Sequence, residues 1–178
     1  MILFHGTDRK IGAIDFTKSR LRTDFGRGFY LSDKLGNARN WAIDKSSIFD
    51  VPTVMRYNVK DEALYDNVLK RRRFDNPTIE WLDFVRDNRQ KSKIGSNNKE
   101  PRHFYDIVSG PMANDKVAIA VDKYCRGVLT VEEALNEVMA IKNVFQLSMH
   151  TLLALTYIQS VSYSQYKNKK WSEWLSCK

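Results

Sequence analysis

Apolar residues recur along this chain at two spacings, and each spacing predicts one type of element. Alternation at every second residue, or a short apolar run bounded by turn residues, predicts a β-strand. Recurrence at every third or fourth residue predicts a helix with one buried face. Strands are expected at 2–5, 51–59, 104–109, 144–149 and 161–166. Helices are expected at 33–43, from Asn76 to about Arg89, from Asn114 or Asp115 to Gly127, from Thr130 to Ile141, and after Thr151.

Two of these elements have the clearest local signals. The strand expected at 144–149 alternates: Val144, Gln146 and Ser148 are expected on one face, and Phe145, Leu147 and Met149 on the other. Thr130 and Glu133 have the spacing of a capping box, in which each side chain binds a backbone N–H of the other residue. A helix is therefore expected to begin directly after Thr130.

The order of these elements indicates the fold class. The chain has no internal repeat and no regular strand–helix–strand alternation, so we expect an α+β fold with a mainly antiparallel sheet. A length of 178 residues predicts one domain that folds unaided. Residues 90–102 contain Gly95 and several basic residues, and are predicted to form a mobile basic loop. Such a loop either contacts a second substrate or is simply solvated.

Composition narrows the class of protein further. Hydrophobic residues make up 43% of the chain, which excludes a disordered protein, and no apolar run approaches the ~20 residues that cross a bilayer. We therefore expect no membrane partner and a cytoplasmic location. Cys125 and Cys177 are too few for a disulfide framework. His5, His103 and His150 are too scattered to predict a metal site.

The formal net charge of +8 favours a polyanionic partner without identifying it. The pyrophosphate of a dinucleotide, a nucleic acid, and an acidic antitoxin, inhibitor or target protein all fit this charge. A basic surface that only keeps the protein soluble fits it equally well.

The stretch from Asp24 to Ala42 contains the most specific local pattern. Gly26 and Gly28 flank a basic residue, three residues of strand character follow, and a helix start comes next. Glycines allow a backbone to approach a ligand closely, and a helix start offers free N–H groups. Two glycines before an aromatic residue are also typical of a simple turn or bulge. The pattern alone therefore leaves both interpretations open.

Two segments resemble the motifs of a known enzyme superfamily. The run from Gly26 to Asp33, followed by Asn40 and Trp41, is similar to the second motif of the diphtheria-toxin and poly(ADP-ribose) polymerase branch of ADP-ribosyltransferases. The run Phe4-His5-Gly6-Thr7 is similar to the first motif of that branch. With Asn88-Arg89, Tyr105 to Val108 and Gly110 to Asp115, the chain resembles a bacterial family of uncharacterised domains assigned to this superfamily.

The resemblance implies a fold and a site. The fold would be a split, mainly antiparallel sheet around an NAD cleft, with helical insertions. His5 would bind a ribose, the Gly6 backbone would hold the nicotinamide carboxamide, and Tyr30 would stack on nicotinamide. The catalytic residues implied are His5, Tyr30 and Gln146. Together with Arg22 and Arg27, which are chosen for their charge, the predicted NAD-binding residues are His5, Gly6, Thr7, Gly28, Phe29, Tyr30 and Trp41.

Basic residues before the glycine loop are candidates for the NAD pyrophosphate. Arg20, Arg22 and Arg27 carry guanidinium groups, which suit bidentate contact with phosphate. A solvated basic loop is the alternative for each of the three.

Gln146 occupies the position where the resembled family carries a catalytic Glu. A carboxylate stabilises the positive charge that develops on the ribose, whereas an amide only positions a hydroxyl and cannot accept a proton. Another acid could complete the site, and the candidates are Asp24, Asp106, Asp115 and Glu80. Each of the three aspartates also has a structural interpretation, as a cap or a hydrogen-bond acceptor.

The sequence therefore predicts an NAD-dependent mono-ADP-ribosyltransferase with a protein or nucleic-acid acceptor. A neutral third residue makes elongation into poly(ADP-ribose) the least expected activity. The alternatives are an NAD glycohydrolase, in which water is the acceptor, and a non-catalytic module that binds NAD, ADP-ribose or nucleic acid.

Overall fold

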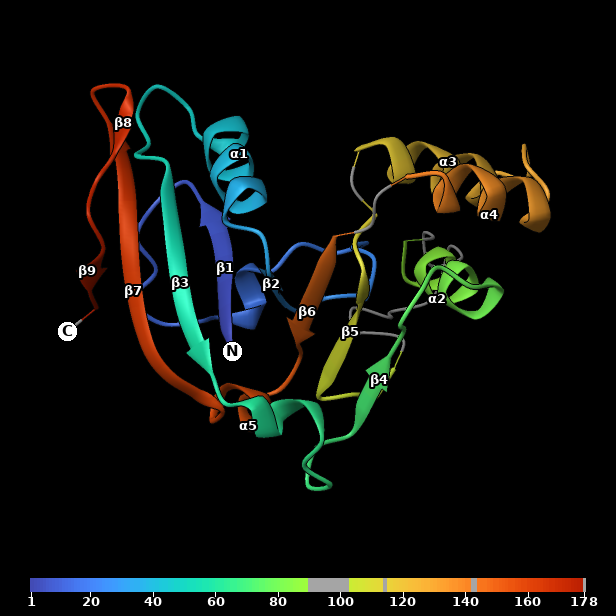
Figure 1. The fold of residues 1–178 in the computed structure, drawn as a ribbon, viewed down its shortest axis with the longest axis horizontal. Coiled ribbons are helices and arrows are strands. Elements are labelled where there is room, and N and C mark those ends of the chain that lie inside the picture. Colours follow the sequence, from blue (N-terminus) through green and yellow to red (C-terminus); the bar gives the residue numbers. More distant parts are fainter. Residues whose placement is uncertain (90–102, 114, 142–143, 178) are drawn as a thin grey trace.

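The structure, a computed structural model, describes residues 1–89, 103–113, 115–141 and 144–177. It is an α+β fold in which a mostly antiparallel open sheet is combined with helices (Figure 1). The strands are β1 Ile2–Thr7, β2 Phe29–Ser32, β3 Thr53–Val59, β4 Arg71–Arg73, β5 Ile107–Pro111, β6 Phe145–Met149, β7 Ile158–Lys167, β8 Lys170–Trp171 and β9 Leu175–Ser176. The α-helices are α1 Leu35–Lys45, α2 Ile79–Arg89, α3 Asp115–Cys125, α4 Val131–Met139 and α5 Leu152–Leu155. Two 3₁₀ turns are Phe16–Lys18 and Asp61–Leu64.

The sheet runs in the order β4-β5-β6-β2-β1-β3-β7-β8, and β9 also pairs with β7. Only β4 and β5 are parallel among the strand pairs of the described residues. β1 and β2 are joined at a single position, Phe4 opposite Ser32, whereas β1 pairs with β3 from Ile2 to Thr7. The two halves of the sheet therefore separate along most of the seam between β1 and β2.

Apolar side chains are buried in separate clusters, and the first of them spans this seam. One cluster lies among β1, β2, β3, β5 and β6, and includes Leu3, Phe29, Leu31, Met55, Tyr57, Leu147 and Met149. A second cluster lies between the sheet and α2, α3 and α4, and includes Phe25, Phe74, Trp81, Leu82, Val108, Val121 and Val138. Figure 1 shows these three helices gathered beyond β5, apart from α1. Trp81 of α2 is buried in the second cluster, and Phe84 of the same helix packs against it.

Several local predictions are confirmed. Phe145, Leu147 and Met149 of β6 join the first cluster from one face of the strand, as the alternation predicts, and Gln146 and Ser148 on the other face are also buried. Thr130 and Glu133 form the expected capping box at the start of α4. Thr151 caps α5 by accepting the backbone N–H of Ala154. These signals depend on residues close together in the sequence, so tertiary packing does not override them.

Two expected helix starts are wrong. α1 begins at Leu35 and not at Ser32 or Asp33, because Ser32 is the last residue of β2 and pairs with Gln146. α2 begins at Ile79, two residues later than the expected Pro77. Its first turn is capped by Thr78, whose Oγ1 accepts the N–H of Trp81.

Three short strands of the structure have no signal in the apolar pattern of the sequence. β4 consists of three arginines, and β8 and β9 lie in the Lys-rich tail, so apolar alternation does not reveal them. β4 is extended because its backbone pairs with β5. The mobile basic loop predicted at 90–102 and the expected cap residue Asn114 lie outside the described residues.

Candidate functional site

His5, Tyr30 and Gln146 lie on three neighbouring strands in the middle of the sheet. His5 is on β1, Tyr30 is on β2 and Gln146 is on β6, and these strands are adjacent in the order β6-β2-β1. On β2, Ser32 lies opposite Gln146 and Tyr30 lies opposite Ser148. The fold therefore places the three residues on adjacent strands. The register puts Tyr30 and Gln146 on the same face of the sheet, whereas the His5 ring packs on Phe29.

His5 is held in one tautomer by the backbone of β2. Its Nδ1–H donates to the carbonyl oxygen of Tyr30 at 2.7 Å, and its ring stacks on Phe29 with centroids 4.5 Å apart. Because a carbonyl only accepts hydrogen bonds, Nδ1 carries the proton and Nε2 is left with a lone pair. Burial lowers the pKa of His5 below its usual value, so the ring is neutral at pH 7. Within the described residues Nε2 has no hydrogen-bond partner, and it is able to accept from a ligand hydroxyl.

The Tyr30 hydroxyl fastens the loop that precedes β2. It accepts the backbone N–H of Phe25 at 2.9 Å and donates to the carbonyl of Gly26 at 2.6 Å. Thr23 Oγ1 lies 2.8 Å from the same hydroxyl. Burial raises the pKa of Tyr30, so the phenol stays protonated. With the hydroxyl occupied, the half-buried ring is the part of Tyr30 that is left for contact with a ligand.

Two histidines that the sequence gives no reason to connect hold the same loop. His103 Nε2–H donates to the Phe25 carbonyl and His150 Nδ1–H donates to the Arg27 carbonyl, each at 2.8 Å. The two rings meet edge to face with centroids 4.6 Å apart. Burial lowers the pKa of His150 to about 4 and also lowers that of His103, so both rings are neutral at pH 7. Their role is to position the loop.

The two loop glycines are explained by contacts inside the protein. Gly26 has a φ of 77°, which side chains rarely adopt. A Cβ on Gly28 would lie 2.7 Å from the His150 ring and 2.9 Å from the carbonyl of Met149. Both glycines are therefore needed by the fold itself, whatever the loop binds.

Gln146 is buried and its amide is oriented by acceptors. Its Nε2 donates to Asp24 Oδ2 at 2.8 Å and to the Pro111 carbonyl at 3.3 Å. Asp24 also accepts from Arg89 Nε at 3.0 Å and Nη2 at 2.5 Å, and from the backbone N–H of Ala113 at 3.0 Å. Both amide hydrogens of Gln146 are thus directed at acceptors, and its Oε1 is the atom that is able to bind a ligand hydroxyl.

Three of the candidate replacement acids, Asp24, Asp106 and Glu80, have structural partners. Asp24 is ion-paired with Arg89, so its negative charge is compensated. Asp106 accepts the backbone N–H of Lys70 at 2.7 Å and the Thr151 hydroxyl at 2.6 Å, joining β4 to α5. Glu80 pairs with Arg72. Asp115 is the first residue of α3. Asp24 is the acid that accepts a hydrogen bond from Gln146.

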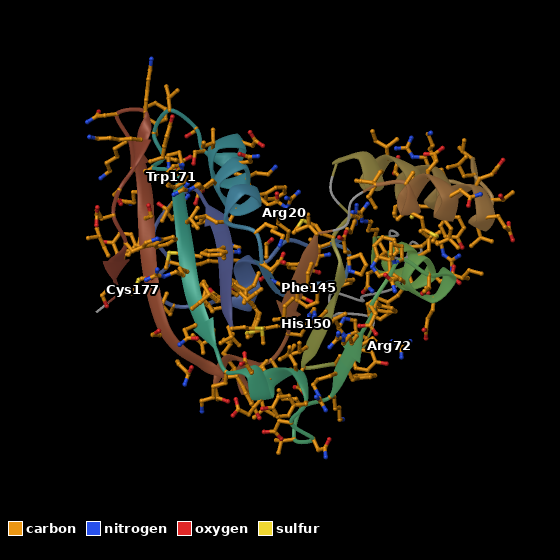
Figure 2. All side chains as sticks on the ribbon, viewed as in Figure 1. Arg20, Arg72, Phe145, His150, Trp171 and Cys177 are labelled. Atoms are coloured by element: carbon orange, nitrogen blue, oxygen red, sulfur yellow. The ribbon has the colours of Figure 1, made fainter. Side chains whose placement is uncertain are left out.

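The arginine candidates have different environments. Arg27 donates through Nε to the Phe16 carbonyl at 2.8 Å and through Nη2 to the Thr17 carbonyl, so its guanidinium anchors the first 3₁₀ turn. Arg22 is exposed and has a φ of 60°. Arg20 is also exposed, and Figure 2 shows it beside α1.

Trp41 lies on α1 between two cations. The Arg20 guanidinium is 5.4 Å from its ring centroid and the Lys45 ammonium is 4.7 Å from it. The ring is 45% exposed, which leaves aromatic surface open to a ligand. α1 itself is fixed to β1, because a Cβ on Gly6 would lie 2.1 Å from the Ala38 carbonyl. Thr7, the next residue of β1, is half-buried and its hydroxyl donates to Asp8 at 3.3 Å.

Comparison with known proteins identifies the family. A family model described as "Protein of unknown function (DUF3990)" matches residues 1–160, which include all the site residues named above. The chain belongs to the DUF3990 family. No curated protein and no solved structure matches this DUF3990 chain. Within the described residues, no three His, Cys, Asp or Glu gather as a metal-ligand set, and no helix has the length and apolarity needed to cross a bilayer.

Proposed function

We propose that this DUF3990 protein is an NAD-dependent mono-ADP-ribosyltransferase, which moves ADP-ribose from NAD to an acceptor and releases nicotinamide. The observation that carries the proposal is the placement of His5, Tyr30 and Gln146 on three adjacent strands, with the His5 ring bonded to the Tyr30 carbonyl. These are the positions that the resemblance to ADP-ribosyltransferases assigns to chemistry. The partly separated seam between β1 and β2 is consistent with the split sheet of that superfamily.

Each of the three residues has a defined part in the proposed reaction. The neutral His5 accepts a ribose hydroxyl at Nε2, and the Gln146 Oε1 accepts the 2′-hydroxyl of the nicotinamide ribose. Tyr30, supported by Trp41, holds the nicotinamide ring. The bond between the anomeric carbon and the nicotinamide nitrogen breaks, and its electron pair leaves with nicotinamide. The acceptor then bonds to that carbon and loses its proton to solvent.

The exposed arginines are the proposed contacts for the NAD pyrophosphate. Arg22 and Arg20 are open to solvent, whereas the guanidinium of Arg27 is engaged by backbone carbonyls. We therefore assign the NAD pyrophosphate to Arg20 and Arg22, and give Arg27 an indirect part through the loop that it anchors. No metal ion has a part in this scheme.

Gln146 limits the acceptors that such an enzyme is able to use. An amide cannot remove a proton from the attacking group. Asp24, the neighbouring carboxylate, is held by Arg89, Ala113 and Gln146. The proposed acceptor is therefore a group that is nucleophilic without a strong base, and transfer stops after one ADP-ribose unit.

The second candidate function is a non-catalytic module that binds NAD or ADP-ribose. It is favoured by the same network, because the compensated charge of Asp24 leaves little negative potential to stabilise a cationic ribose. Under this alternative the site would bind NAD with unchanged geometry and release no nicotinamide.

Release of free nicotinamide from NAD tests the proposal. We would compare the wild type with His5→Ala, Gln146→Ala and the control Phe49→Ala, whose side chain is 90% exposed. His5→Ala is expected to lower the rate at least about 100-fold, as loss of a transition-state hydrogen bond does. Phe49→Ala is expected to match the wild type. Thermal unfolding of each variant separates lost chemistry from lost folding.

Mass spectrometry distinguishes the remaining outcomes. A transferase requires added lysate and yields ADP-ribose adducts, whereas a glycohydrolase releases nicotinamide in buffer alone. NAD binding without nicotinamide release in any condition would overturn the transferase and favour the binding module.

A further inference from the structure

An open hollow lies beside β4. Figure 1 shows β4 at the opposite edge of the sheet from β7 and β8. The hollow has a volume of about 630 Å³ and is lined by Lys70, Arg71, Phe84, His103, Phe104 and Tyr105. Four of these six side chains are aromatic rings and the other two are cations. The lining comes from the start of β4, from α2 and from the segment before β5.

The aromatic rings form a graded series from the core to the solvent. Phe84 packs in the core and stacks on His103 at 5.3 Å, and His103 lies 5.4 Å from Tyr105. Phe104 is 91% exposed. Its neighbours are anchored, since His103 binds Phe25 and the Asp106 N–H donates to the Lys70 carbonyl at 2.6 Å. The fold therefore presents the Phe104 ring to solvent on a fixed backbone.

The cations beside these rings have few acidic partners. Residues 70–73 are four consecutive basic residues. Arg72, which Figure 2 shows on β4, pairs with Glu80, and Arg73 pairs with Asp75. Lys70 and Arg71 form no salt bridge within the described residues. Two positive charges thus remain next to the exposed ring.

We propose that this hollow binds single-stranded nucleic acid. Unpaired bases stack on Phe104 and Tyr105, and the phosphates between them contact Lys70 and Arg71. Rings that stack on bases, next to cations that follow the backbone, are the combination that single-strand binding requires. An acidic polypeptide would use the cations and leave the rings in water. A duplex would keep its bases out of reach.

His103 connects the hollow to the loop of the candidate site. His103 lines the hollow and also donates to the carbonyl of Phe25, whose N–H binds the Tyr30 hydroxyl. A strand bound here would lie close to the loop that Tyr30 fastens, which makes it a candidate acceptor for ADP-ribose. The acceptor role rests on the proposed transferase function, whereas binding itself does not.

Fluorescence anisotropy without NAD tests the binding. The probes are labelled 12-mers of single-stranded DNA and RNA, a duplex of equal length, and polyglutamate as competitor. Phe104→Ala is expected to weaken single-strand binding about 5-fold or more, the loss of one stacked base. Phe49→Ala, an aromatic ring of similar exposure, is expected to change nothing. Comparison of the two single strands shows whether DNA or RNA is preferred.

A second matched pair of variants tests the proposed phosphate contacts of Lys70 and Arg71. Lys70→Ala/Arg71→Ala is expected to reduce the slope of log K against log salt by about 1.4, for two lost phosphate contacts to a single strand. Lys167→Ala/Lys170→Ala removes two exposed cations at the opposite edge of the sheet, and should leave both slope and affinity unchanged. Equal affinity of Phe104→Ala and Phe49→Ala would overturn the proposal. So would competition by polyglutamate as strong as that by the oligonucleotide, or duplex binding as tight as single-strand binding.

Adding NAD to the bound oligonucleotide separates this proposal from the transferase function. If the single strand binds but carries no ADP-ribose adduct, the hollow binds nucleic acid but the strand is not the acceptor. If adducts form on protein and no oligonucleotide binds, the transferase function is supported and the proposed binding surface is wrong.

Discussion

The cluster around Tyr30 and the hollow beside β4 both contain aromatic and polar side chains. They differ in whether these side chains have partners inside the protein. In the Tyr30 cluster the histidines, the phenol, Asp24 and Gln146 are all hydrogen-bonded within the protein. In the hollow, Phe104 faces solvent and two cations form no salt bridge within the described residues. Internal partners fix geometry and contribute to stability, whereas groups without partners contribute only when a ligand arrives. Substitutions in the two regions should therefore affect different measurements.

The largest effect on stability is expected from Asp24→Ala. It leaves Arg89 partly buried without its partner and Gln146 with one of its two acceptors, which should cost about 3–5 kcal/mol in the free energy of unfolding. Urea denaturation measures this loss. Asp75→Ala is the control, because it breaks an exposed pair with Arg73 and should cost less than about 1 kcal/mol. Equal losses in the two variants would show that the Asp24 network does not hold the loop.

A pH dependence of about 2 kcal/mol is expected between pH 7 and pH 5, from the His150 pKa of about 4. Because that pKa lies below the value in the unfolded chain, the unfolded state binds more protons, so the free energy of unfolding falls as the pH falls. His103 and His5 act in the same direction. Urea titrations at both pH values measure the effect. His150→Gln should show a smaller slope, and an unchanged slope would contradict this assignment.

Gly28→Ala should cost about 1–3 kcal/mol, because the added Cβ meets the His150 ring and the Met149 carbonyl. Thermal or urea unfolding measures it. Gly36→Ala provides the contrast. Gly36 lies in α1 with no atom within 4 Å of an added Cβ, so the change should stabilise the protein by about 0.5–1 kcal/mol. If both variants behave alike, the close contact with His150 is not what requires glycine at position 28.

The smallest effect on stability is expected from Phe104→Ala. Its ring is exposed, so the free energy of unfolding should change by no more than about 0.5 kcal/mol although oligonucleotide binding weakens. The same urea titration measures it. A loss above about 1 kcal/mol would place Phe104 with the internally bonded cluster, and would remove the contrast between the two regions.

The sequence predicts those parts of the fold that depend on local chemistry. The capping box at Thr130, the cap at Thr151 and the alternation of β6 are confirmed, since each needs only neighbouring residues. The strand β4 is not predictable in this way. Its three arginines form a strand only because β5 offers backbone partners.

The candidate site also has a part that the sequence predicts and a part that it does not. His5, Tyr30 and Gln146 are found from motifs and strand order. The link from Gln146 through Asp24 to Arg89 joins residues that are 122 and 65 positions apart, and no local pattern indicates it. The clamp formed by His103 and His150 is equally long-range, because both histidines bind carbonyls of the glycine loop.

The contact between Gly6 and Ala38 has a consequence for ligand selectivity. Because no atom larger than hydrogen fits at Gly6, α1 cannot slide or rotate on β1 without breaking that contact. Trp41 therefore keeps one position relative to β1. Under the proposed function, a dinucleotide held at Trp41 would meet a wall that does not move, so the protein should discriminate among dinucleotides and their fragments by size.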